Sequence, residues 1–236
     1  MKQVKSKRRV ADHGEVFTAL REVNAMLDLV KNETERIESR FLEPACGEGN
    51  FLTEILRRKL AVVKKKYGGI RQHADYEMWS VIAVMNIYGV ELLPDNVAIC
   101  RERLFEIWNE AYTESCKKDA SDLCREIVQF ILERNILCGD ALSLKDAAGK
   151  PIIFSEWGMM SNGLVKRTDY TFAELLEQEK IIPDMVPIKK KEYRTDSPQM
   201  ALFETLEDSD YDTNGNKIAQ FKPIHYLKLK KQQEKY

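Results

Sequence analysis

Histidine and paired cysteines are scarce in this 236-residue chain, which contains three His, five Cys and no Cys-x-x-Cys pair. Structural zinc sites use closely spaced Cys and His ligands, and small secreted domains depend on paired cysteines. The composition therefore predicts neither a metal site nor a disulfide framework. We expect the cysteines to be reduced and mostly buried.

Long apolar runs are also missing, because no stretch of 18 apolar residues occurs and the basic N-terminus has no apolar segment after it. A membrane-spanning helix needs about 20 apolar residues, and a secretion signal needs a shorter apolar core. We therefore expect a cytoplasmic protein without a membrane segment.

No charge of one sign dominates, since 37 Lys and Arg stand against 38 Asp and Glu. A free-standing nucleic-acid binder usually has a basic excess. The excess here is local: residues 1–74 contain 16 Lys and Arg and 10 Asp and Glu. This could be a phosphate-binding surface, although a solvated helix face explains it more simply.

With 44% hydrophobic residues, the chain is long enough for one domain with an appendage. Residues 1–13 are polar and basic and are expected to form a loose arm. Residues 14–182 form the main domain in this interpretation, and residues 183–236 form a C-terminal extension.

The extension contains Asn214-Gly215, a dipeptide typical of tight hairpin turns. Short apolar segments at 200–203 and 218–221 flank it and could form the two strands. A charged tail is expected from Lys228 to Lys235.

The most informative stretch is residues 41–52, with the sequence Phe-Leu-Glu-Pro-Ala-Cys-Gly-Glu-Gly-Asn-Phe-Leu. A short apolar strand runs into a turn and then into an apolar helix that begins at Asn50 or Phe51. Gly47 and Gly49 lack side chains where the chain must bend and where a ligand must approach the backbone. The free N–H groups of the helix point at the same place. The pattern predicts a ligand-binding loop, although a pair of glycines alone is also typical of ordinary turns.

Apolar periodicity predicts alternating helices and strands through the first three-fifths of the chain. Helices are expected from Glu15 to Val30 and over 51–63, 76–85, 97–111 and 121–133, and strands over 40–43, 87–92 and 135–138. With right-handed crossovers this order gives an α/β fold, in which a parallel sheet carries helices on both faces. A ligand would lie across the carboxyl ends of the strands.

Residues 43–52 closely resemble the S-adenosylmethionine loop of DNA amino-methyltransferases, Asp-Pro-Ala-Cys-Gly-x-Gly-Asn-Phe-Leu, with Glu43 in place of the usual Asp. The resemblance extends from residue 14 to about residue 145 and implies a Rossmann-like class I methyltransferase fold with a short C-terminal appendage. It implies that Glu43 holds the methionine amino group and that Gly47 and Gly49 admit the cofactor. The loop residues implied in cofactor binding are Glu43, Ala45, Cys46, Gly47, Gly49, Asn50 and Phe51.

Three further segments resemble cofactor-binding elements of the same family. The segment Gly14-Glu15-Val16-Phe17-Thr18 is similar to Gly-Glu-x-Phe-Thr-Pro, with Ala19 at the proline position, and implies that Phe17 and Thr18 close over the methionine end. Glu91, followed by Leu92, matches the acidic residue that binds the ribose hydroxyls. Asp140, followed by Ala141, matches the residue that accepts a hydrogen bond from the adenine amino group. Helix starts, acidic strand ends and Gly-Asp turns are each common without a ligand.

The Asn/Asp-Pro-Pro-aromatic motif of these enzymes is missing, because the chain contains no Pro-Pro pair. In the family this motif follows the fourth strand, hydrogen-bonds the target amino group and stacks on the flipped base. We expect the fourth strand at 151–154, which makes Ser155, Glu156 and Trp157 the positional candidates for catalysis. Glu156 could accept a hydrogen bond and Trp157 could stack on a base; alternatively, Trp157 is a core residue and Glu156 is solvated.

Three functions are compatible with these features. The favoured one is an S-adenosylmethionine-dependent DNA adenine amino-methyltransferase of the restriction-modification type, which depends on a partner protein for sequence recognition and binds DNA weakly alone. The second is a catalytically inactive cofactor-binding subunit with a structural or regulatory role. The third is a methyltransferase that acts on RNA or a small molecule. The missing motif leaves turnover by this chain alone an open question.

Overall fold

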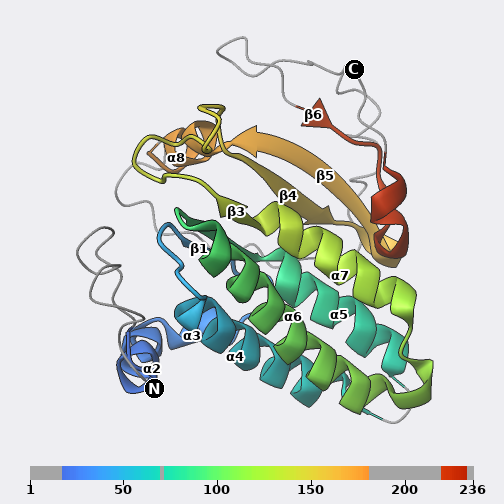
Figure 1. Ribbon diagram of the computed structural model, residues 1–236. Helices are drawn as coiled ribbons and strands as arrows, with labels where there is room; N and C mark the ends of the chain where they lie inside the picture. Colours follow the sequence, from blue (N-terminus) through green and yellow to red (C-terminus); the bar gives the residue numbers. More distant parts are fainter. Residues whose placement is uncertain (1–17, 70–71, 181–218, 233–236) are drawn as a thin grey trace.

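The computed structural model describes residues 18–69, 72–180 and 219–232 (Figure 1). Its first sheet is parallel and has the strand order β1-β2-β3, formed by β1 (Phe41–Glu43), β2 (Ile87–Glu91) and β3 (Ile136–Cys138). β2 is central and all five of its residues are buried. Strands joined by helices into a parallel sheet make this an α/β fold, as the sequence predicts.

Four long helices connect these strands and lie side by side in Figure 1. They are α4 (Asn50–Tyr67) and α5 (His73–Met85) between β1 and β2, and α6 (Pro94–Cys116) and α7 (Asp122–Asn135) between β2 and β3, with a 3-10 turn, η1 (Lys117–Asp119), between the last two. Each begins or ends within a few residues of its predicted position. α4 ends with three lysines, whose charges complement the negative end of the helix dipole.

The two faces of the parallel sheet have different coverings. Phe41 faces α4, where Lys59 Nζ lies 5.3 Å from the centre of its ring. Tyr88 points to the opposite side and meets Phe154 edge-on, with ring centres 5.7 Å apart. In the described part of the chain, that opposite face therefore carries an antiparallel sheet where the sequence predicts a layer of helices.

The antiparallel sheet is built on a long hairpin of β4 (Ile153–Met159) and β5 (Leu164–Thr171), joined by η2 (Ser161–Gly163). Asn162 and Gly163 both have positive φ, at 61° and 71°, as a tight turn requires. The predicted fourth strand was therefore wrong in its limits and its partner, because β4 pairs antiparallel with β5 instead of joining the parallel sheet.

The remaining described elements pack around this core. They are α2 (Leu20–Leu29), α3 (Lys31–Thr34), α8 (Phe172–Lys180), β6 (Ala219–Gln220), β7 (Ile224–His225) and η3 (Tyr226–Lys231). β6 and β7 pair with β5, and η3 packs on α7 with Leu229 fully buried. Residues 228–231 of the predicted charged tail form η3, in which Lys228, Lys230 and Lys231 are exposed. Residues 200–203 and Asn214-Gly215 of the predicted hairpin, and the predicted helix start before residue 18, lie outside the described residues.

Candidate functional site

Glu91, at the carboxyl end of β2, ties that strand to the glycine-rich loop after β1. Its Oε2 accepts a hydrogen bond from Gly47 N–H at 2.9 Å, and the Cys46 N–H donates to the carbonyl of Val90 at 2.9 Å. Oε1 accepts from Leu93 N–H at 3.0 Å and from Asn96 Nδ2 at 3.3 Å. The carboxylate is only 9% exposed. The loop and the acidic strand end therefore form one polar cluster.

The same contacts limit what Glu91 can still bind. A carboxylate has about four lone-pair positions, and in Glu91 three of these accept the hydrogen bonds described above. One position remains for a hydroxyl group, and a second would become free if Gly47 N–H moved away. A ribose diol therefore fits this carboxylate if the loop shifts at Gly47, whose φ of 53° lies in the left-handed region.

Gly49 packs closely against α6, a contact that the sequence does not predict. A Cβ atom at this position would lie 2.6 Å from Cys100 Sγ, on α6, and φ is 80°. The missing side chain thus lets the loop pack against α6. Gly89 on β2 makes room for Cys46 of the loop and Leu52 of α4, because its Cβ would lie 2.9 Å from both Cys46 Sγ and Leu52 Cδ1. A glycine inside an apolar strand indicates that another part of the chain packs closely there, and the sequence interpretation did not use this signal at Gly89.

Asn50 connects the loop to the N-terminal segment. Its Nδ2 donates to the carbonyl of Thr18 at 3.2 Å, and its Oδ1 accepts from Arg103 Nη1 at 3.0 Å. Thr18 therefore lies beside the glycine-rich loop, where the sequence predicts the N-terminal element to be. Phe17 lies outside the described residues.

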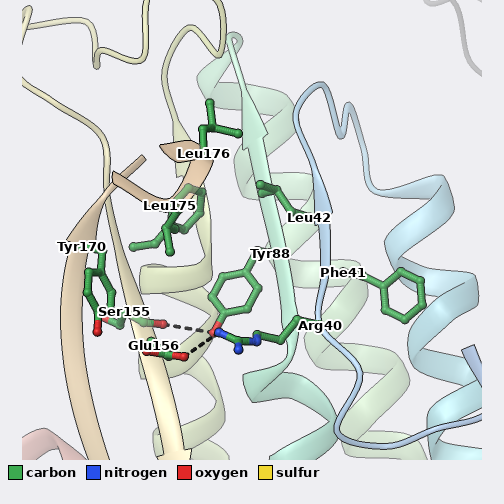
Figure 2. A pocket seen from close by; sticks show the side chains of 10 residues that line it. Arg40, Phe41, Leu42, Tyr88, Ser155, Glu156, Tyr170, Leu175 and Leu176 are labelled. Carbon is green, nitrogen blue, oxygen red and sulfur yellow. Dashed lines mark hydrogen bonds and ion pairs between the residues drawn. The ribbon is translucent and has the colours of Figure 1, made fainter. Parts of the chain in front are cut away.

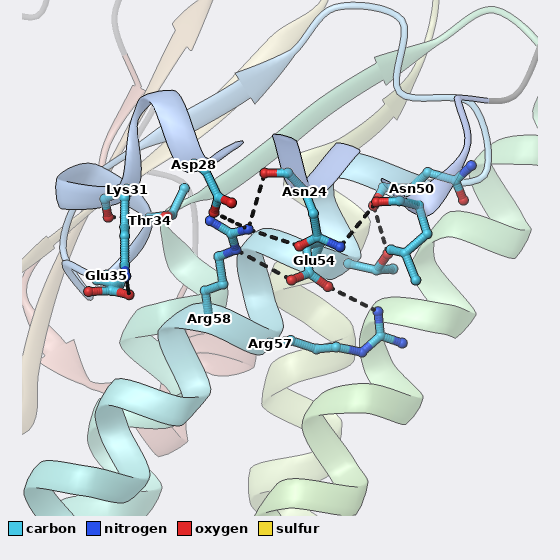
Figure 3. A network of polar contacts seen from close by, with 11 residues as sticks. Asn24, Asp28, Lys31, Thr34, Glu35, Asn50, Glu54, Arg57 and Arg58 are labelled. Atoms are coloured by element: carbon cyan, nitrogen blue, oxygen red, sulfur yellow. Dashed lines mark hydrogen bonds and ion pairs between the residues drawn. The ribbon is translucent and has the colours of Figure 1, made fainter. Parts of the chain in front are cut away.

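α2 is held against α4 by the polar network shown in Figure 3. Arg58 Nη2 lies 2.9 Å from Asn24 Oδ1 and 2.9 Å from Asp28 Oδ1, and its Nε lies 3.3 Å from Glu54 Oε1. The Arg58 side chain is only 15% exposed, so these charge-assisted contacts are partly shielded from water. This network positions the helix that follows Thr18.

The other predicted cofactor residues differ in burial and environment. Burial raises the pKa of the Glu43 carboxyl group at the end of β1. A hydrogen bond with Cys100 and then burial raise the pKa of Cys46, so its thiol is held protonated. Phe51 and Ala141 are partly buried, Ala45 is exposed and Leu92 is exposed.

Asp140 follows β3 and has an exposed carboxylate that is engaged locally. Its Oδ1 accepts from Leu142 N–H at 2.9 Å, and this bond, with Ser143, lowers the pKa of Asp140. Such a contact is typical of an Asx turn. Adenine binding would therefore use the remaining acceptor positions of this carboxylate.

A cavity of about 530 Å³ lies beside the first two strands (Figure 2). Its lining residues come from both sheets and α8: Arg40, Phe41, Leu42, Tyr88, Phe154, Ser155, Glu156, Tyr170, Leu175 and Leu176. Arg40 Nη1 and Glu156 Oε1 form an ion pair across it at 2.5 Å, and Tyr88 Oη donates to the Ser155 carbonyl at 3.2 Å. No predicted cofactor-binding residue lines this cavity.

The three positional candidates for catalysis diverge. Ser155 is buried, and its Oγ donates to Asp169 at 2.7 Å and accepts from Arg167 Nε at 3.0 Å. Glu156 faces the cavity. Trp157 is 6% exposed, lies in the core and donates from Nε1 to Asn135 Oδ1 at 2.9 Å. Because all three lie inside β4 and not after its end, they do not form a group equivalent to the missing motif.

The described residues contain no cluster of three or more His, Cys, Asp or Glu side chains suited to a metal ion. In the same described part of the chain, every helix is too short or too polar to cross a membrane.

Comparison with known proteins found one informative similarity. Over 105 residues, 44% of its length, the chain is 30% identical to a protein of Methanocaldococcus jannaschii described as a putative type II restriction enzyme and methyltransferase. The matched segment covers 8% of that much longer protein. No protein-family model matches the chain, and no solved structure matches it. The similarity supports a relationship to restriction-modification methyltransferases. The element order and the parallel sheet define the fold as α/β.

Proposed function

We propose that this chain is the S-adenosylmethionine-binding part of a methyltransferase that acts on adenine amino groups in DNA. The observation that carries the proposal is the hydrogen bond from Gly47 N–H to Glu91, because it brings the glycine-rich loop and the acidic end of β2 together at one edge of a parallel sheet. The relative described as a restriction enzyme and methyltransferase supports the reaction class.

Each part of the cofactor has a candidate partner in this chain. Glu43 would bind the methionine ammonium group, Glu91 the ribose hydroxyls and Asp140 the adenine amino group. Thr18 and Asn50, which are hydrogen-bonded to each other, would border the methionine end. When bound, the cofactor supplies an electrophilic methyl group on its sulfonium.

The proposal assigns no residue of this chain to activation of the target amino group. That amino group is a weak nucleophile, because its lone pair is delocalised into the base, and it must be oriented by hydrogen bonds. Ser155 is buried in contacts with Asp169 and Arg167, and Trp157 is a core residue. We therefore expect DNA methylation to need a partner chain, and DNA binding by the isolated chain to be weak and to fall steeply with salt.

Calorimetry with S-adenosylmethionine tests the cofactor site directly. The parent protein should bind, and Glu91→Ala should weaken binding by at least about tenfold, because charge-assisted hydrogen bonds are each worth roughly 1.5–3 kcal/mol. Glu126→Ala, a surface carboxylate paired with Lys230, is the matched control and should bind normally. A parent protein that does not bind S-adenosylmethionine would refute the proposal.

A second candidate is a cofactor-binding subunit without methyl transfer. The burial of Trp157 and the location of Ser155 to Trp157 inside a strand favour it. An assay of radiolabelled methyl transfer to DNA, with and without co-expressed neighbouring genes, separates the two functions. Methyl transfer in the presence of a partner protein supports the first function. Cofactor binding without methyl transfer, whichever partner is present, supports the second.

A further inference from the structure

Arg103 joins the glycine-rich loop to the neighbouring helix α6. Its Nη1 donates to the carbonyl of Glu48 at 2.5 Å and to Asn50 Oδ1 at 3.0 Å. Glu48 lies inside the loop, and Asn50 is the first residue of α4. Because Glu91 binds the Gly47 N–H at 2.9 Å, the loop is held from β2 at Gly47 and from α6 at Glu48.

Arg103 also determines which way the side-chain amide of Asn50 points. A guanidinium group only donates hydrogen bonds, so the oxygen of this amide must face it. The amide nitrogen then points the other way, where it donates to the carbonyl of Thr18 at 3.2 Å. A reversed amide would set its N–H groups against the guanidinium and its oxygen against the Thr18 carbonyl, and both bonds would be lost. The contacts from Arg103 through Asn50 to Thr18, the Arg103 relay, therefore have one favourable arrangement.

The Arg103 relay connects three separate elements. Arg103 lies on α6, Asn50 begins α4, and Thr18 lies two residues before α2. All three residues are partly buried, so the hydrogen bonds between them are partly shielded from water. A bond from a charged donor is also stronger than one between neutral groups. Loss of the guanidinium should therefore release the Thr18 carbonyl, although Asn50 stands between the two residues.

We propose that Arg103 is a positioning residue that sets the affinity of the site for the amino-acid half of S-adenosylmethionine. The inference rests on the proposed function, in which Thr18 and Asn50 border the methionine end of the cofactor. Glu91 and Asp140, which would bind the ribose and the adenine, are held by backbone N–H groups of their own surroundings. Loss of Arg103 should therefore weaken the binding of one half of the cofactor and spare the other half.

Two neutral thioethers separate the two halves. S-adenosylhomocysteine and methylthioadenosine share the adenosine group and the sulfur, but only the first has the amino-acid chain. In calorimetry, Arg103→Met should weaken the binding of S-adenosylhomocysteine at least about tenfold, because two charge-assisted hydrogen bonds are lost. The affinity for methylthioadenosine should change by less than about threefold, since its contacts do not depend on the Arg103 relay. Equal weakening of both ligands, or weakening of neither, would overturn the inference.

Arg101 provides the matched control on the same helix. It also donates to backbone carbonyls, those of Ile136 at 2.9 Å and Glu133 at 3.0 Å, which belong to β3 and α7. Arg101→Met should lower the stability of the fold and leave the ratio of the two ligand affinities within about threefold of the parent. A ratio that falls as far as in Arg103→Met would show that the effect is general destabilisation, which would overturn the inference.

Two further substitutions at Arg103 test the hydrogen bonds themselves. Arg103→Gln replaces Arg103→Met if the latter does not fold, and the same loss is expected, because its shorter side chain carries no charge. Both bonds of Arg103 come from one nitrogen, so a lysine ammonium group can supply them. Arg103→Lys should therefore keep an affinity ratio closer to the parent. If it loses as much as the uncharged variants, the hydrogen bonds are not the cause and the inference is overturned.

A measurement without any ligand tests the Arg103 relay independently of the proposed function. Arg103→Met and Asn50→Ala each remove the bond between these residues, so the double variant should lose less unfolding free energy in urea than the two single variants together. Strict additivity would overturn the inference. A parent protein that binds neither thioether would refute the proposed function and, with it, the role of Arg103 in cofactor binding. Thioether binding with an unchanged affinity ratio in Arg103→Met would refute only the role of Arg103.

Discussion

The indole N–H of Trp157 donates to Asn135 Oδ1 at 2.9 Å, and the amide of the same Asn135 donates to the carbonyls of Val84, Met85 and Ile87. Asn135 ends α7, Trp157 lies on β4, and the three carbonyls surround the turn from α5 into β2. One buried amide thus joins both sheets to the helical layer. Of the two alternatives for Trp157, base stacking and burial in the core, the structure shows burial in the core.

Trp157→Ala should therefore destabilise the fold by about 3–5 kcal/mol, as truncation of a buried tryptophan does. S-adenosylmethionine affinity measured below the melting transition should stay within about twofold of the parent. Urea unfolding gives the first quantity and calorimetry the second. Ile153→Ala, at an exposed position on the same strand, is the control and should cost much less. A stable variant with an altered cofactor affinity would contradict this assignment.

Gly49→Ala should destabilise the protein by about 1–3 kcal/mol, because its Cβ would collide with Cys100 Sγ. Cys100→Ala removes that sulfur, so the double variant should recover part of the loss. The recovery should be incomplete, since φ at residue 49 stays positive. Unfolding of both single variants and the double variant completes the cycle, and strict additivity would show that the two residues are independent.

Gly47→Val should lower the affinity for S-adenosylmethionine more than it lowers the stability of the fold. Gly47 also has a positive φ, and its N–H binds Glu91, so a branched side chain would distort the loop at the proposed ribose contact. We expect cofactor affinity to fall at least about tenfold, measured by calorimetry. Gly149→Val is the matched control, because that glycine also has a positive φ but its missing Cβ faces open space.

As the pH is lowered, the affinity for S-adenosylmethionine should begin to fall while the pH is still above 4.5. Burial raises the pKa of Glu43 from 4.5, so the carboxylate that would bind the methionine ammonium group becomes neutral at a higher pH than an exposed glutamate does. Titrations across the acid range should show this loss. Glu43→Gln should bind weakly with a smaller pH dependence, whereas an identical profile in both proteins would exclude Glu43.

Lys59 should give the protein a distinct alkaline signature. Its ammonium group is fully buried, donates to the carbonyls of Arg36, Ile37 and Ser39, and has a pKa lowered by burial to about 7. Between about pH 7 and 10.5 the unfolded chain binds a proton that the folded chain does not, so this residue's contribution to stability rises with pH and is lost as pH falls through 7.

Comparison of the parent with Lys59→Met isolates that contribution from other titrating groups. As the pH rises through this range, the unfolding free energy of the parent should increase relative to that of Lys59→Met by up to about 1.4 kcal/mol per pH unit. Urea unfolding at several pH values measures it. A difference that does not vary with pH would show that Lys59 stays charged in the folded protein.

Local sequence patterns were sufficient for the elements whose partners are near in the chain. The helices of the first half and the strands at β1, β2 and β3 follow apolar periodicity, because each buries one face against its sequence neighbours. The clustering of Gly47, Glu91 and Asn50 also follows from chain order, since the carboxyl ends of adjacent parallel strands lie at one edge.

The β4–β5 hairpin was missed because the family resemblance implied a different fourth strand. Asn162-Gly163, between two alternating segments, was a usable hairpin signal. Other features depend on contacts that chain order does not encode. Gly49 packs against Cys100, where a Cβ atom would lie only 2.6 Å from Sγ, and Trp157 bonds to Asn135. Both contacts join residues from separate elements, and no local pattern distinguishes these residues from ordinary turn and core residues.

The attachment of the last described segment has a consequence for how the chain would behave when cut. Tyr226 Oη donates to Glu77 Oε1 at 2.7 Å, and Tyr112 donates to the other oxygen of the same carboxylate. β6 and β7 pair with β5, and Leu229 is buried against α7. A protease that cleaves between Lys180 and Ala219 would therefore leave two fragments that stay associated and co-purify without a covalent link.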